Sequence, residues 1–331
     1  MTEITLLEAV NQALAHELAA DRRVVLFGED IGGNGGVFRA TDGLQQRFGK
    51  ERVMDTPLAE NMIAGIAVGM AAQGLRPVAE FQFMGFSYPG LDQILSHAAR
   101  TRNRTRGRLS CPIVYRAPYG GGIHAPEHHS ESTEALFAHI PGLRVVVPSS
   151  PARAYGLLLA AIRDPDPVIF LEPKRIYRAV RQQVPDNGQA LPLDRCFRLR
   201  QGTDITLVAW GAALRETLAA ADALAATGIE AEVIDPATLK PLDIHGIIDS
   251  LEKTGRCVIV HEAARFAGLG AEIAAQINEY AFDLLRAPVQ RVTGYDTVMP
   301  YYQLEKDYLP DCRRILAAAH AALDYPPGGE R

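Results

Sequence analysis

The sequence predicts an α/β protein with two parallel-sheet domains, and three observations carry that prediction. Short apolar runs rich in β-branched residues, such as residues 24–27 and 205–209, are typical of buried strands. Longer stretches with apolar residues at helical spacing alternate with these runs along the whole chain. Strands that alternate with helices favour parallel sheets covered by helices on both faces. The length of 331 residues suffices for two such domains.

The first half of the chain begins with a predicted helix. Thr5 and Glu8 have the spacing of a capping box, and apolar residues follow at helical intervals. Glycines Gly32–Gly36 predict a loop, and Gly65 and Gly69 are expected to let the small-residue helix 60–72 pack closely. The other elements expected in this half are strands at 24–27, 78–83, 112–116, 143–148 and 168–172, and helices at 92–102 and 151–162.

The second half repeats the alternation of strands and helices. Strands are expected at 205–209, 231–234 and 257–260, and helices at 214–227 and 244–253. Proline, asparagine and glycine are frequent between residues 180 and 202, which predicts a connection between domains. The expected boundaries are a first domain at 1–182, a linker at 183–203 and a second domain at 204–331.

Composition excludes several classes of protein. The net charge of −5 gives no electrostatic footprint for nucleic acid. The basic run at residues 100–108 is the local exception: it is suited to phosphates or an acidic partner, or it is a solvated helix end. No apolar run of about 18 residues is present, so no membrane span is expected.

The cysteines and the N-terminus point to the cytoplasm. Cys111, Cys196, Cys257 and Cys312 are widely spaced, which is typical of reduced thiols rather than of a zinc site or a disulfide framework. The first residues lack the basic and apolar regions of a signal peptide. We therefore expect a cytoplasmic protein.

One loop combines glycines with histidines and acids. Residues 120–132 read GGGIHAPEHHSES. Glycine lets the backbone approach a ligand closely, and histidine moves protons near neutral pH. The loop is either part of a functional site or a polar surface loop with solvated histidines. The chain lacks a strand-to-helix GxGxxG fingerprint, a GxxxxGK[ST] loop and a GxSxG elbow, which disfavours dinucleotide-dependent dehydrogenases, P-loop NTPases and serine hydrolases.

Two further segments accompany the histidine loop: DTPLAE at 55–60 and EFQFMGF at 80–86. Together the three segments resemble the beta subunit of the thiamine-diphosphate-dependent decarboxylase of 2-oxo acid dehydrogenase complexes. The resemblance runs along nearly the whole chain, with further matching strings at residues 28–44, 74–83, 161–178, 252–263 and 291–297. It implies a transketolase-like pyrimidine-binding domain followed by a transketolase C-terminal-like domain.

The resemblance implies a catalytic role for Glu60 and His129. Glu60 would be the carboxyl that hydrogen-bonds the aminopyrimidine ring of the cofactor and drives its tautomer change. Such a carboxyl is expected in apolar surroundings, which raise its pKa. The alternative is that Glu60 only stabilises a helix N-terminus. His129 would lie beside the reactive carbon, orienting the substrate carboxylate or handling protons during acyl transfer to a lipoyl arm; His124 is an accessory candidate.

The cofactor-binding wall follows from the same resemblance. Phe86 would stack on the aminopyrimidine ring, and Gln82 and Leu58 match neighbouring positions. Glu29 is a candidate for the same wall. An aromatic residue at a strand end is otherwise a common core residue.

Half of a thiamine site is missing from the sequence. Enzymes of this kind hold the diphosphate through Mg²⁺ bound by a GDG motif, and the chain contains no GDG. A diphosphate without its metal ion is poorly neutralised. The resemblance therefore implies that a separate alpha subunit holds most of the Mg²⁺ site, in an α2β2 heterotetramer.

A monovalent-cation loop is also implied. Backbone carbonyls and a carboxylate favour a hard cation such as K⁺ over zinc. The alternative is a turn stiffened by proline without a metal ion. The ligands carried over by position are Ile113, Ala161, Ile162, Asp164 and Asp166.

The substrate and the partners are less sharply indicated. Residues 124–132 and 82–86 favour pyruvate, whereas residues 171–178 and 88–93 favour branched-chain 2-oxo acids; we expect pyruvate dehydrogenase (acetyl-transferring), with the branched-chain enzyme as the alternative. The second domain is expected to support the tetramer and to dock a lipoyl-bearing acyltransferase core. A self-contained transketolase-like enzyme and a non-catalytic scaffold subunit are the remaining alternatives.

Overall fold

The computed structural model describes residues 3–326, which divide into two compact units. Unit 1 contains the described residues up to Gly120 together with residues 128–193. Unit 2 contains residues 121–127 together with the described residues from Asp194 onward. Within the described range, no helix is long and apolar enough to cross a membrane. All four cysteines are free thiols.

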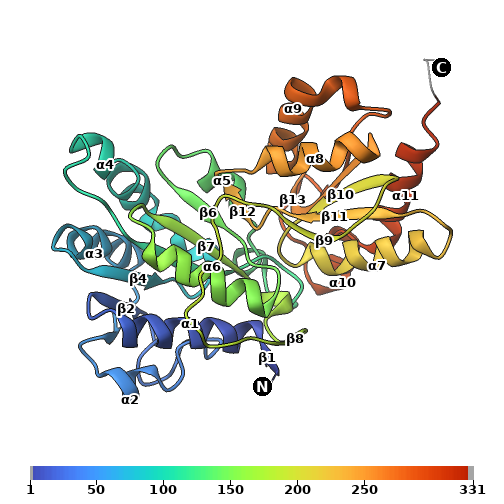
Figure 1. Ribbon diagram of the computed structural model, residues 1–331. Coiled ribbons are helices and arrows are strands. Elements are labelled where there is room, and N and C mark those ends of the chain that lie inside the picture. The colour runs from blue at the N-terminus through green and yellow to red at the C-terminus, as the bar shows by residue number, and fades with distance from the viewer. Residues whose placement is uncertain (1–2, 327–331) are drawn as a thin grey trace. The chain divides into compact units, whose positions relative to one another are not determined.

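Unit 1 is built on a parallel sheet, as expected. Its strands lie in the order β6-β7-β5-β4-β2-β3, and every pairing between these neighbours is parallel. Among them, Figure 1 labels β6, β7, β4 and β2. A separate antiparallel pair joins β1 and β8. The strand bounds are β1 Glu3–Thr5, β2 Val24–Gly28, β3 Val53–Asp55, β4 Arg76–Glu80, β5 Val114–Tyr119, β6 Arg144–Val146, β7 Val168–Pro173 and β8 Arg181–Gln183.

The helices of unit 1 connect these strands. The α-helices are α1 Leu6–Ala20, α2 Leu44–Phe48, α3 Glu60–Ala72, α4 Thr101–Arg104, α5 Glu134–Ala138 and α6 Pro151–Arg163. Short helical segments are η1 Met84–Gly90, η2 Gln93–Ala98, η3 Glu127–His129 and η4 Lys174–Ile176.

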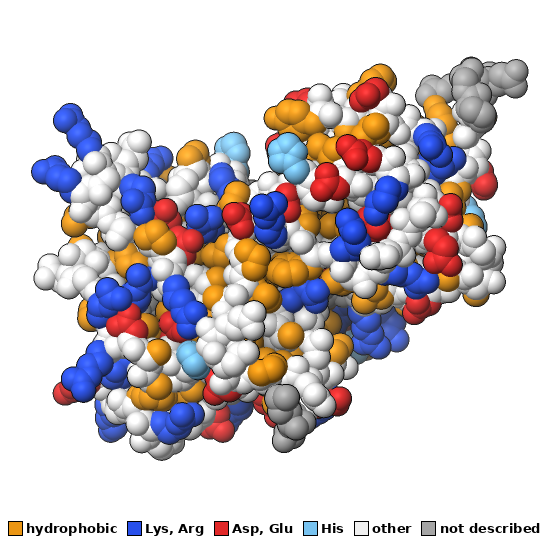
Figure 2. Space-filling view, viewed as in Figure 1, with side chains coloured by type: hydrophobic (Ala, Val, Ile, Leu, Met, Phe, Trp, Pro, Cys, Tyr) orange, Lys and Arg blue, Asp and Glu red, His pale blue; other side chains and the backbone are white. Residues whose placement is uncertain are grey.

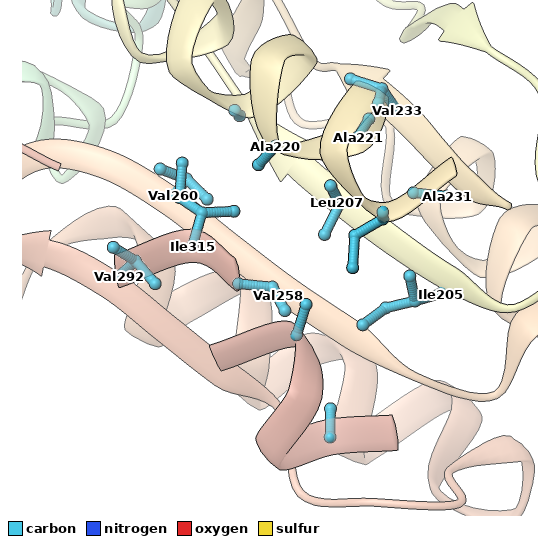
Figure 3. Packing of buried hydrophobic residues seen from close by; sticks show 14 of the residues in the cluster. Ile205, Leu207, Ala220, Ala221, Ala231, Val233, Val258, Val260, Val292 and Ile315 are labelled. Carbon is cyan, nitrogen blue, oxygen red and sulfur yellow. The ribbon is translucent and has the colours of Figure 1, made fainter. Parts of the chain in front are cut away.

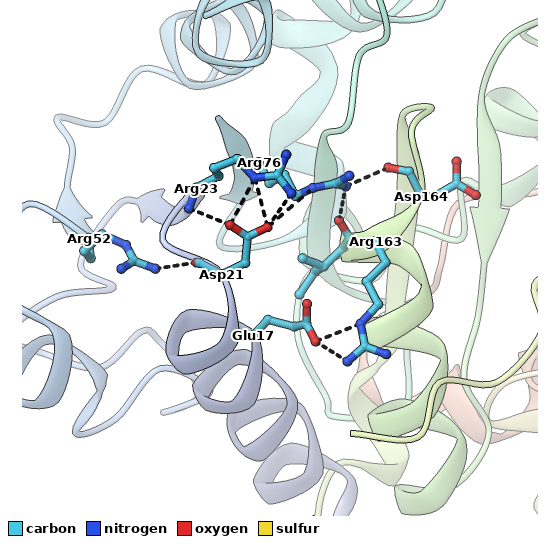
Figure 4. A network of polar contacts seen from close by, with 8 residues as sticks. Glu17, Asp21, Arg23, Arg52, Arg76, Arg163 and Asp164 are labelled. Atoms are coloured by element: carbon cyan, nitrogen blue, oxygen red, sulfur yellow. Dashed lines mark hydrogen bonds and ion pairs between the residues drawn. The ribbon is translucent and has the colours of Figure 1, made fainter. Parts of the chain in front are cut away.

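The predicted capping box starts α1. The Thr5 hydroxyl accepts a hydrogen bond from the Glu8 amide at 3.2 Å, and the Glu8 carboxylate accepts one from the Thr5 amide at 2.7 Å. The helix packs against α6. The Arg163 guanidinium at the end of α6 pairs with the Glu17 carboxylate of α1 at 2.6 Å (Figure 4). A local cap therefore starts α1, and a long-range ion pair joins its last turn to α6.

Unit 2 contains a second, mainly parallel sheet with the strand order β14-β13-β10-β11-β9. Its strands are β9 Phe197–Arg200, β10 Ile205–Ala209, β11 Ala231–Asp235, β13 Cys257–Ala264 and β14 Gln290–Gly294, and β12 spans Thr238–Lys240. Its helices are α7 Ala213–Ala225, α8 Ile244–Thr254, α9 Leu269–Ala281, η5 Phe282–Leu284, α10 Tyr302–Tyr308 and α11 Cys312–Leu323.

Alternate residues of the unit 2 strands contact helices on opposite faces of the sheet. Leu207 and Val258 pack in one core with residues of α7 and α11, including Ala220 and Ile315 (Figure 3). The intervening Thr206 hydroxyl instead hydrogen-bonds the Ser250 and Thr254 hydroxyls of α8, at 2.8 and 2.7 Å. This division follows from the two-residue period of a strand, which points neighbouring side chains to opposite faces.

Several expected elements differ from the structure. The strand expected at 78–83 is β4, Arg76–Glu80, because the chain turns into the short helix η1 soon after Glu80. The helix expected at 92–102 is wrong as one element: η2 is a π-helix, and α4 follows it separately. The predicted connection at 180–202 contains β8 and β9, and β9 runs antiparallel to β11.

The expected close packing at two glycines of α3 is wrong. A methyl group at Gly69 would meet nothing within 4 Å, and one at Gly65 would make only ordinary contact with Gln93 at 3.4 Å. The small-residue face of α3 is therefore not covered at Gly69 by the described residues.

The basic run at 100–108 lies on the surface of unit 1. Its arginine side chains are exposed, and Figure 2 shows Lys and Arg side chains projecting where Figure 1 labels α4. Arg102 pairs with Asp166 at 2.6 Å, and Arg104 donates a hydrogen bond to the Ser96 carbonyl at 2.8 Å. Part of this charge is thus used within the unit.

Candidate active site

Glu60 is the first residue of α3, where the helix dipole stabilises an acidic side chain. The helix has no side-chain cap, because its N-cap residue is Ala59. Glu60 is half-buried; Ile63, in the same helix, is buried, and Leu58, two residues before Glu60, is 71% exposed.

A second carboxyl, Glu29, lies close to Glu60. Glu29 follows β2 and is half-buried. Burial raises its pKa, and the charges of Asp30 and Glu60 raise that pKa further. Gln82, after β4, donates a long hydrogen bond of 3.5 Å to the Asp30 carboxylate. The ends of β2 and β4 thus bring Glu29 and Gln82 to Asp30, and Glu60 at the start of α3 lies close enough to Glu29 for its charge to act on it; we call this group the acidic wall.

The segment η1 connects this wall to the histidine loop through two glycines. A methyl group at Gly90 would come within 2.9 Å of the Glu60 carbonyl oxygen. At Gly85, a methyl group would collide with the His128 carbonyl oxygen. Only glycine permits these two approaches, so η1 packs against the start of α3 at one end and against the loop at the other.

His129 lies in an aromatic cluster with Phe83 and Phe86. Its ring centroid is 4.6 Å from that of Phe83 and 5.0 Å from that of Phe86, in edge-to-face geometry. His128 also contacts Phe86, with 5.2 Å between the two ring centroids. Phe83 was not predicted as a site residue, although the string EFQFMGF contains it.

The Nδ1 atom of His129 is buried and has no hydrogen-bond partner among the residues that the structure describes. A buried polar atom without a partner is costly unless a ligand or water satisfies it. The hydroxyl of Thr56, in the DTPLAE string, is in the same state. The site therefore presents two buried polar atoms that a bound molecule can satisfy.

The base of the histidine loop is closed within unit 1. The Gly120 amide donates a hydrogen bond to the Glu131 carbonyl at 2.9 Å, and the Lys174 ammonium donates to the Gly120 carbonyl. Lys174 also lies 5.7 Å from the Phe83 ring centroid, which permits a cation–π contact. Burial and the Glu131 carboxylate raise the pKa of Tyr88, so its hydroxyl stays neutral and can donate to that carboxylate.

A buried ion cluster underlies the site. Arg116 of β5, 1% exposed, pairs with Glu80 of β4 and with Glu172 of β7, the latter at 2.6 Å. The Tyr177 hydroxyl donates to Glu172 at 2.6 Å. Burial raises the pKa of Glu80, and the Arg116 charge opposes that shift. These side chains join the carboxyl ends of three strands, which carry the residues that form the site.

The residues implied as cation ligands lie around the end of α6. The carbonyl oxygens of Ile162 and Asp164 both accept hydrogen bonds from the Arg76 guanidinium, at 2.8 and 3.2 Å. Figure 4 shows Arg76 and Asp164. The Asp164 carboxylate accepts one from the Asp166 amide at 2.8 Å. The Ile113 carbonyl accepts one from Val168 at 2.8 Å, and that of Ala161 accepts one from Asp164 at 3.3 Å.

The predicted site residues therefore fall into groups. Glu29, Glu60 and Gln82 line one wall, and Phe86 and His129 are in direct contact. Leu58 is exposed beside them, and the implied cation ligands form a separate loop. Sequence reasoning missed Phe83, Lys174 and the Glu80–Arg116–Glu172 cluster. Most of these residues lie in the matching strings, but a string does not show which partners a residue meets on other strands.

Comparisons with known proteins find two domain families that match successive parts of the chain. Residues 2–180 match the family described as "Transketolase, pyrimidine binding domain". Residues 195–315 match the one described as "Transketolase, C-terminal domain". A solved structure described as "Split gene transketolase, inactive beta4 tetramer" superposes with a TM-score of 0.80 at 26% identity, covering 98% of this chain and 99% of that one.

Curated relatives cover nearly the whole chain. "Pyruvate dehydrogenase E1 component subunit beta" of Acholeplasma laidlawii is 51% identical over 317 residues, which are 96% of this chain and 97% of that protein. The protein of the same name from Bacillus subtilis is 48% identical over 325 residues, 98% of this chain and all (100%) of that protein. The resemblance inferred from the motifs is confirmed. The chain therefore belongs to the family of pyruvate dehydrogenase E1 component beta subunits.

Proposed function

We propose that this chain supplies the aminopyrimidine side of a thiamine-diphosphate site and, with a separate alpha chain, decarboxylates pyruvate and passes the acetyl group to a lipoyl arm. The observation that carries the proposal is the meeting, within unit 1, of an acidic wall and an aromatic–histidine cluster. Glu60 is close enough to Glu29 for its charge to raise the pKa of that neighbour. Family membership over almost the full length supports it.

The residues present fit an aminopyrimidine ring. A flat heteroaromatic ring needs an aromatic face and polar groups at its edge, which Phe86 and the Glu60 carboxyl offer. The buried Nδ1 of His129 and the buried hydroxyl of Thr56, without partners among residues 3–326, can be satisfied by such a ligand or its substrate. When bound, thiamine diphosphate supplies a carbanion that attacks the 2-oxo carbonyl and holds the electron pair left by CO₂.

Each side chain has a distinct task in this proposal. Glu60 holds and returns a proton at the ring edge, where the open side next to Leu58 gives access. Glu29 places a second carboxyl beside that of Glu60. The two groups favour sharing one proton, because two neighbouring carboxylates resist being ionised together. Phe83 and Phe86 exclude water from the His129 ring, which orients the substrate carboxylate or moves a proton at its unpaired nitrogen.

The alpha chain completes the site in this proposal. The sequence contains no GDG motif for Mg²⁺, so we assign that ion and the diphosphate mainly to the alpha subunit. Leu58, 71% exposed beside Glu60, is apolar surface that a second polypeptide would cover. The expected assembly is α2β2. The solved relative is described as an inactive beta4 tetramer, which supports the expectation that this chain alone is inactive.

Decarboxylation measured with an artificial electron acceptor tests the proposal. The assay uses this chain alone and copurified with its alpha partner, in the presence of thiamine diphosphate, Mg²⁺, and pyruvate or 3-methyl-2-oxobutanoate. We expect activity with pyruvate only in the complex. Faster turnover of 3-methyl-2-oxobutanoate would assign the chain to the branched-chain enzyme, and activity without the partner would overturn the half-site.

A scaffold role predicts a different result. A verified complex that binds no thiamine diphosphate and decarboxylates neither acid would make the chain a non-catalytic subunit. The lipoyl-bearing acyltransferase core and the cytoplasmic location stay predictions from the sequence. Unit 2 offers Val298, Tyr301 and Tyr302, each at least 60% exposed, as apolar surface for the tetramer or that core.

The K⁺ site is a separate proposal. Arg76 donates one hydrogen bond to each of the Ile162 and Asp164 carbonyls, and a carbonyl oxygen has a second lone pair for a cation. Bound K⁺ at about 100 times its Kd would stabilise the fold by about 2.7 kcal/mol. Thermal unfolding in KCl compared with choline chloride at equal ionic strength measures this. Equal melting temperatures in the two salts would remove K⁺ from the cofactors.

A further inference from the structure

Lys174 is a buried lysine of unit 1 that lies next to the aromatic cluster of Phe83, Phe86 and His129. It is the first residue of η4, directly after β7, and it is 4% exposed. Lysine is rarely buried to this extent without specific partners, because its ammonium loses its hydration. The partners of this ammonium within unit 1 therefore indicate what its burial achieves.

The first contact of Lys174 is with the end of β5. The last residues of β5 and β7 are paired in parallel register, so the residues that follow them, Gly120 and Lys174, leave the sheet side by side. The Lys174 ammonium donates a hydrogen bond to the Gly120 carbonyl. The Gly120 amide donates to the Glu131 carbonyl at 2.9 Å, and Glu131 lies two residues after His129. Lys174 thus holds the backbone turn to which the residues after His129 are attached.

The second contact is with the aromatic cluster itself. The Lys174 nitrogen lies over the Phe83 ring, 5.7 Å from its centroid, which is within the range of a cation–π attraction. The His129 ring packs edge-to-face against Phe83, with 4.6 Å between the ring centroids. The same ammonium therefore supports His129 by two routes, one through a neighbouring ring and one through the backbone. Every residue of both routes belongs to unit 1.

The orientation of the His129 ring depends on such support. Its Nδ1 has no hydrogen-bond partner among residues 3–326, so no polar contact within the described chain fixes the ring from that side. Aromatic packing and the adjoining backbone then set its position. A displacement of about 1 Å in a catalytic group can cost about 100-fold in rate. A cation that holds both the neighbouring ring and the adjoining backbone is suited to limit such a displacement.

We infer that Lys174 is a positioning residue for His129, acting through the Phe83 ring and through the hydrogen bond between Gly120 and Glu131. The inference rests on the proposed function of His129. The positive charge matters for both contacts, because it strengthens the hydrogen bond to the carbonyl and attracts the face of the ring. Arginine at this position would keep that charge, whereas methionine would keep an apolar stem and lose both contacts. The two substitutions therefore separate positioning by the charge from simple packing.

Variants of the complex with the alpha chain test this inference. They are Lys174→Met, Lys174→Arg and, as the reference for the step that depends on His129, His129→Ala. Arg163→Met is the matched control, because it removes a cation from the buried Glu17 carboxylate at a different contact of the same unit. The rates of decarboxylation and of acyl transfer to a lipoyl acceptor are measured for each complex, together with hydrogen exchange at the Gly120 amide.

The expected result is specific. In Lys174→Met, the partial reaction that slows most in His129→Ala slows by about tenfold or more. Exchange of the Gly120 amide rises by about tenfold or more, because the turn is no longer held. Lys174→Arg recovers most of the rate and of the protection. Arg163→Met lowers the melting temperature and leaves the ratio of the two rates and the Gly120 exchange unchanged. Lys174→Gln, whose neutral amide can still donate to the carbonyl, serves if Lys174→Met does not assemble and gives a smaller change in the same direction.

Other outcomes overturn the inference. Faster exchange at Gly120 with unchanged rates would mean that Lys174 holds the turn without positioning His129. A rate loss in Lys174→Met that Lys174→Arg does not recover would assign the effect to packing, and an equal loss in Arg163→Met would reduce it to general stability. Unchanged rates in Lys174→Met would refute the inference alone, whereas a wild-type complex that does not decarboxylate pyruvate would refute the proposed function and this role with it.

Discussion

His129 in unit 1 and His261 in unit 2 have similar surroundings and opposite accessibility. His129 is half-buried between Phe83 and Phe86, and its Nδ1 has no hydrogen-bond partner in the described part of the chain. His261 is 0% exposed and stacks on Trp210, with 5.0 Å between ring centroids and 12° between planes. Neither ring nitrogen of His261 meets hydrogen-bond geometry within residues 3–326, although the Ala263 backbone lies near enough to affect its charge.

The difference separates the histidine that we propose as catalytic, His129, from a structural one, His261. Burial, with the nearby charge of Arg291, lowers the pKa of His261 to about 3, so its ring stays neutral at physiological pH. Gly268 and Gly270 close over it, since a methyl group at either position would approach the ring within 2.8 Å. A sealed ring cannot exchange protons with a substrate. An unpartnered polar atom indicates function only where the side chain remains accessible.

The largest expected effect is at the open site. Glu60→Gln keeps the size of the side chain but removes the proton that it holds, so decarboxylation by the complex falls about 100-fold or more. Its melting temperature changes little, because the residue is half-buried at a helix start. Glu272→Gln, at an exposed first turn of α9, is the control and retains full activity. Wild-type rates in Glu60→Gln would contradict the catalytic assignment and remove the contrast with unit 2.

The next effect concerns the buried ion cluster of Glu80, Arg116 and Glu172. Arg116→Met leaves Glu80 and Glu172 buried without their cation, which costs about 3–5 kcal/mol of folding free energy. Urea denaturation measures this loss. Arg200→Met removes an exposed pair with Asp222, and we expect about 1 kcal/mol or less. Equal losses in both variants would show that the buried cluster is no more important than a surface ion pair.

A pH dependence sharpens the assignment of His261. The unfolded residue binds a proton below about pH 6.5, whereas the folded one stays neutral down to about pH 3. The unfolded state therefore binds more protons in this window, and stability falls by about 1.4 kcal/mol for each pH unit as the pH decreases within it. Urea unfolding at pH 7 and pH 5 measures the slope. His261→Gln should flatten it and exposed His320→Gln should not; a slope unchanged by His261→Gln would mean that the ring is accessible when folded.

The smallest effect is local to two helix starts. Thr5→Ala removes the cap of α1 in unit 1, and Asp243→Ala removes the cap of α8 in unit 2, where its carboxylate accepts from the Gly246 amide at 3.1 Å. Each loss should cost about 1 kcal/mol in thermal or urea unfolding and leave the kinetics of the complex intact. A loss of activity in either variant would show that the caps serve the site as well as the helix.

Local elements were the most predictable part of the fold. The helix Glu60–Ala72 and the strand Ile205–Ala209 have the bounds expected from their apolar patterns, and the capping box at Thr5 starts α1. These features depend on residues close together in the sequence. The π-helix Gln93–Ala98 was missed because an apolar pattern of helical period does not distinguish an α-helix from a π-helix over so short a stretch.

Motifs indicated the residues of the proposed site, but not the buried residues that support them. Motifs marked Glu29, Glu60, Gln82, Phe86 and His129, and unit 1 brings them into two adjoining groups. The buried ion cluster joins Glu80, Arg116 and Glu172 from three separate strands. Glu80 and Glu172 lie in strings that match the family, but no local pattern shows that they meet Arg116, because the three residues come from separate strands.

The sequence by itself determined the α/β class, the order of the pyrimidine-binding and C-terminal domains and the family, and it indicated the residues that we propose for the site. Only the tertiary structure decided which histidine is sealed, that β9 runs antiparallel, and that residues 121–127 belong to unit 2. The physical reason is separation along the chain. The Gly121 and His124 amides hydrogen-bond carboxylates of unit 2 that lie 141 and 181 residues further along the chain, and such contacts are fixed by packing of the whole unit rather than by any local pattern.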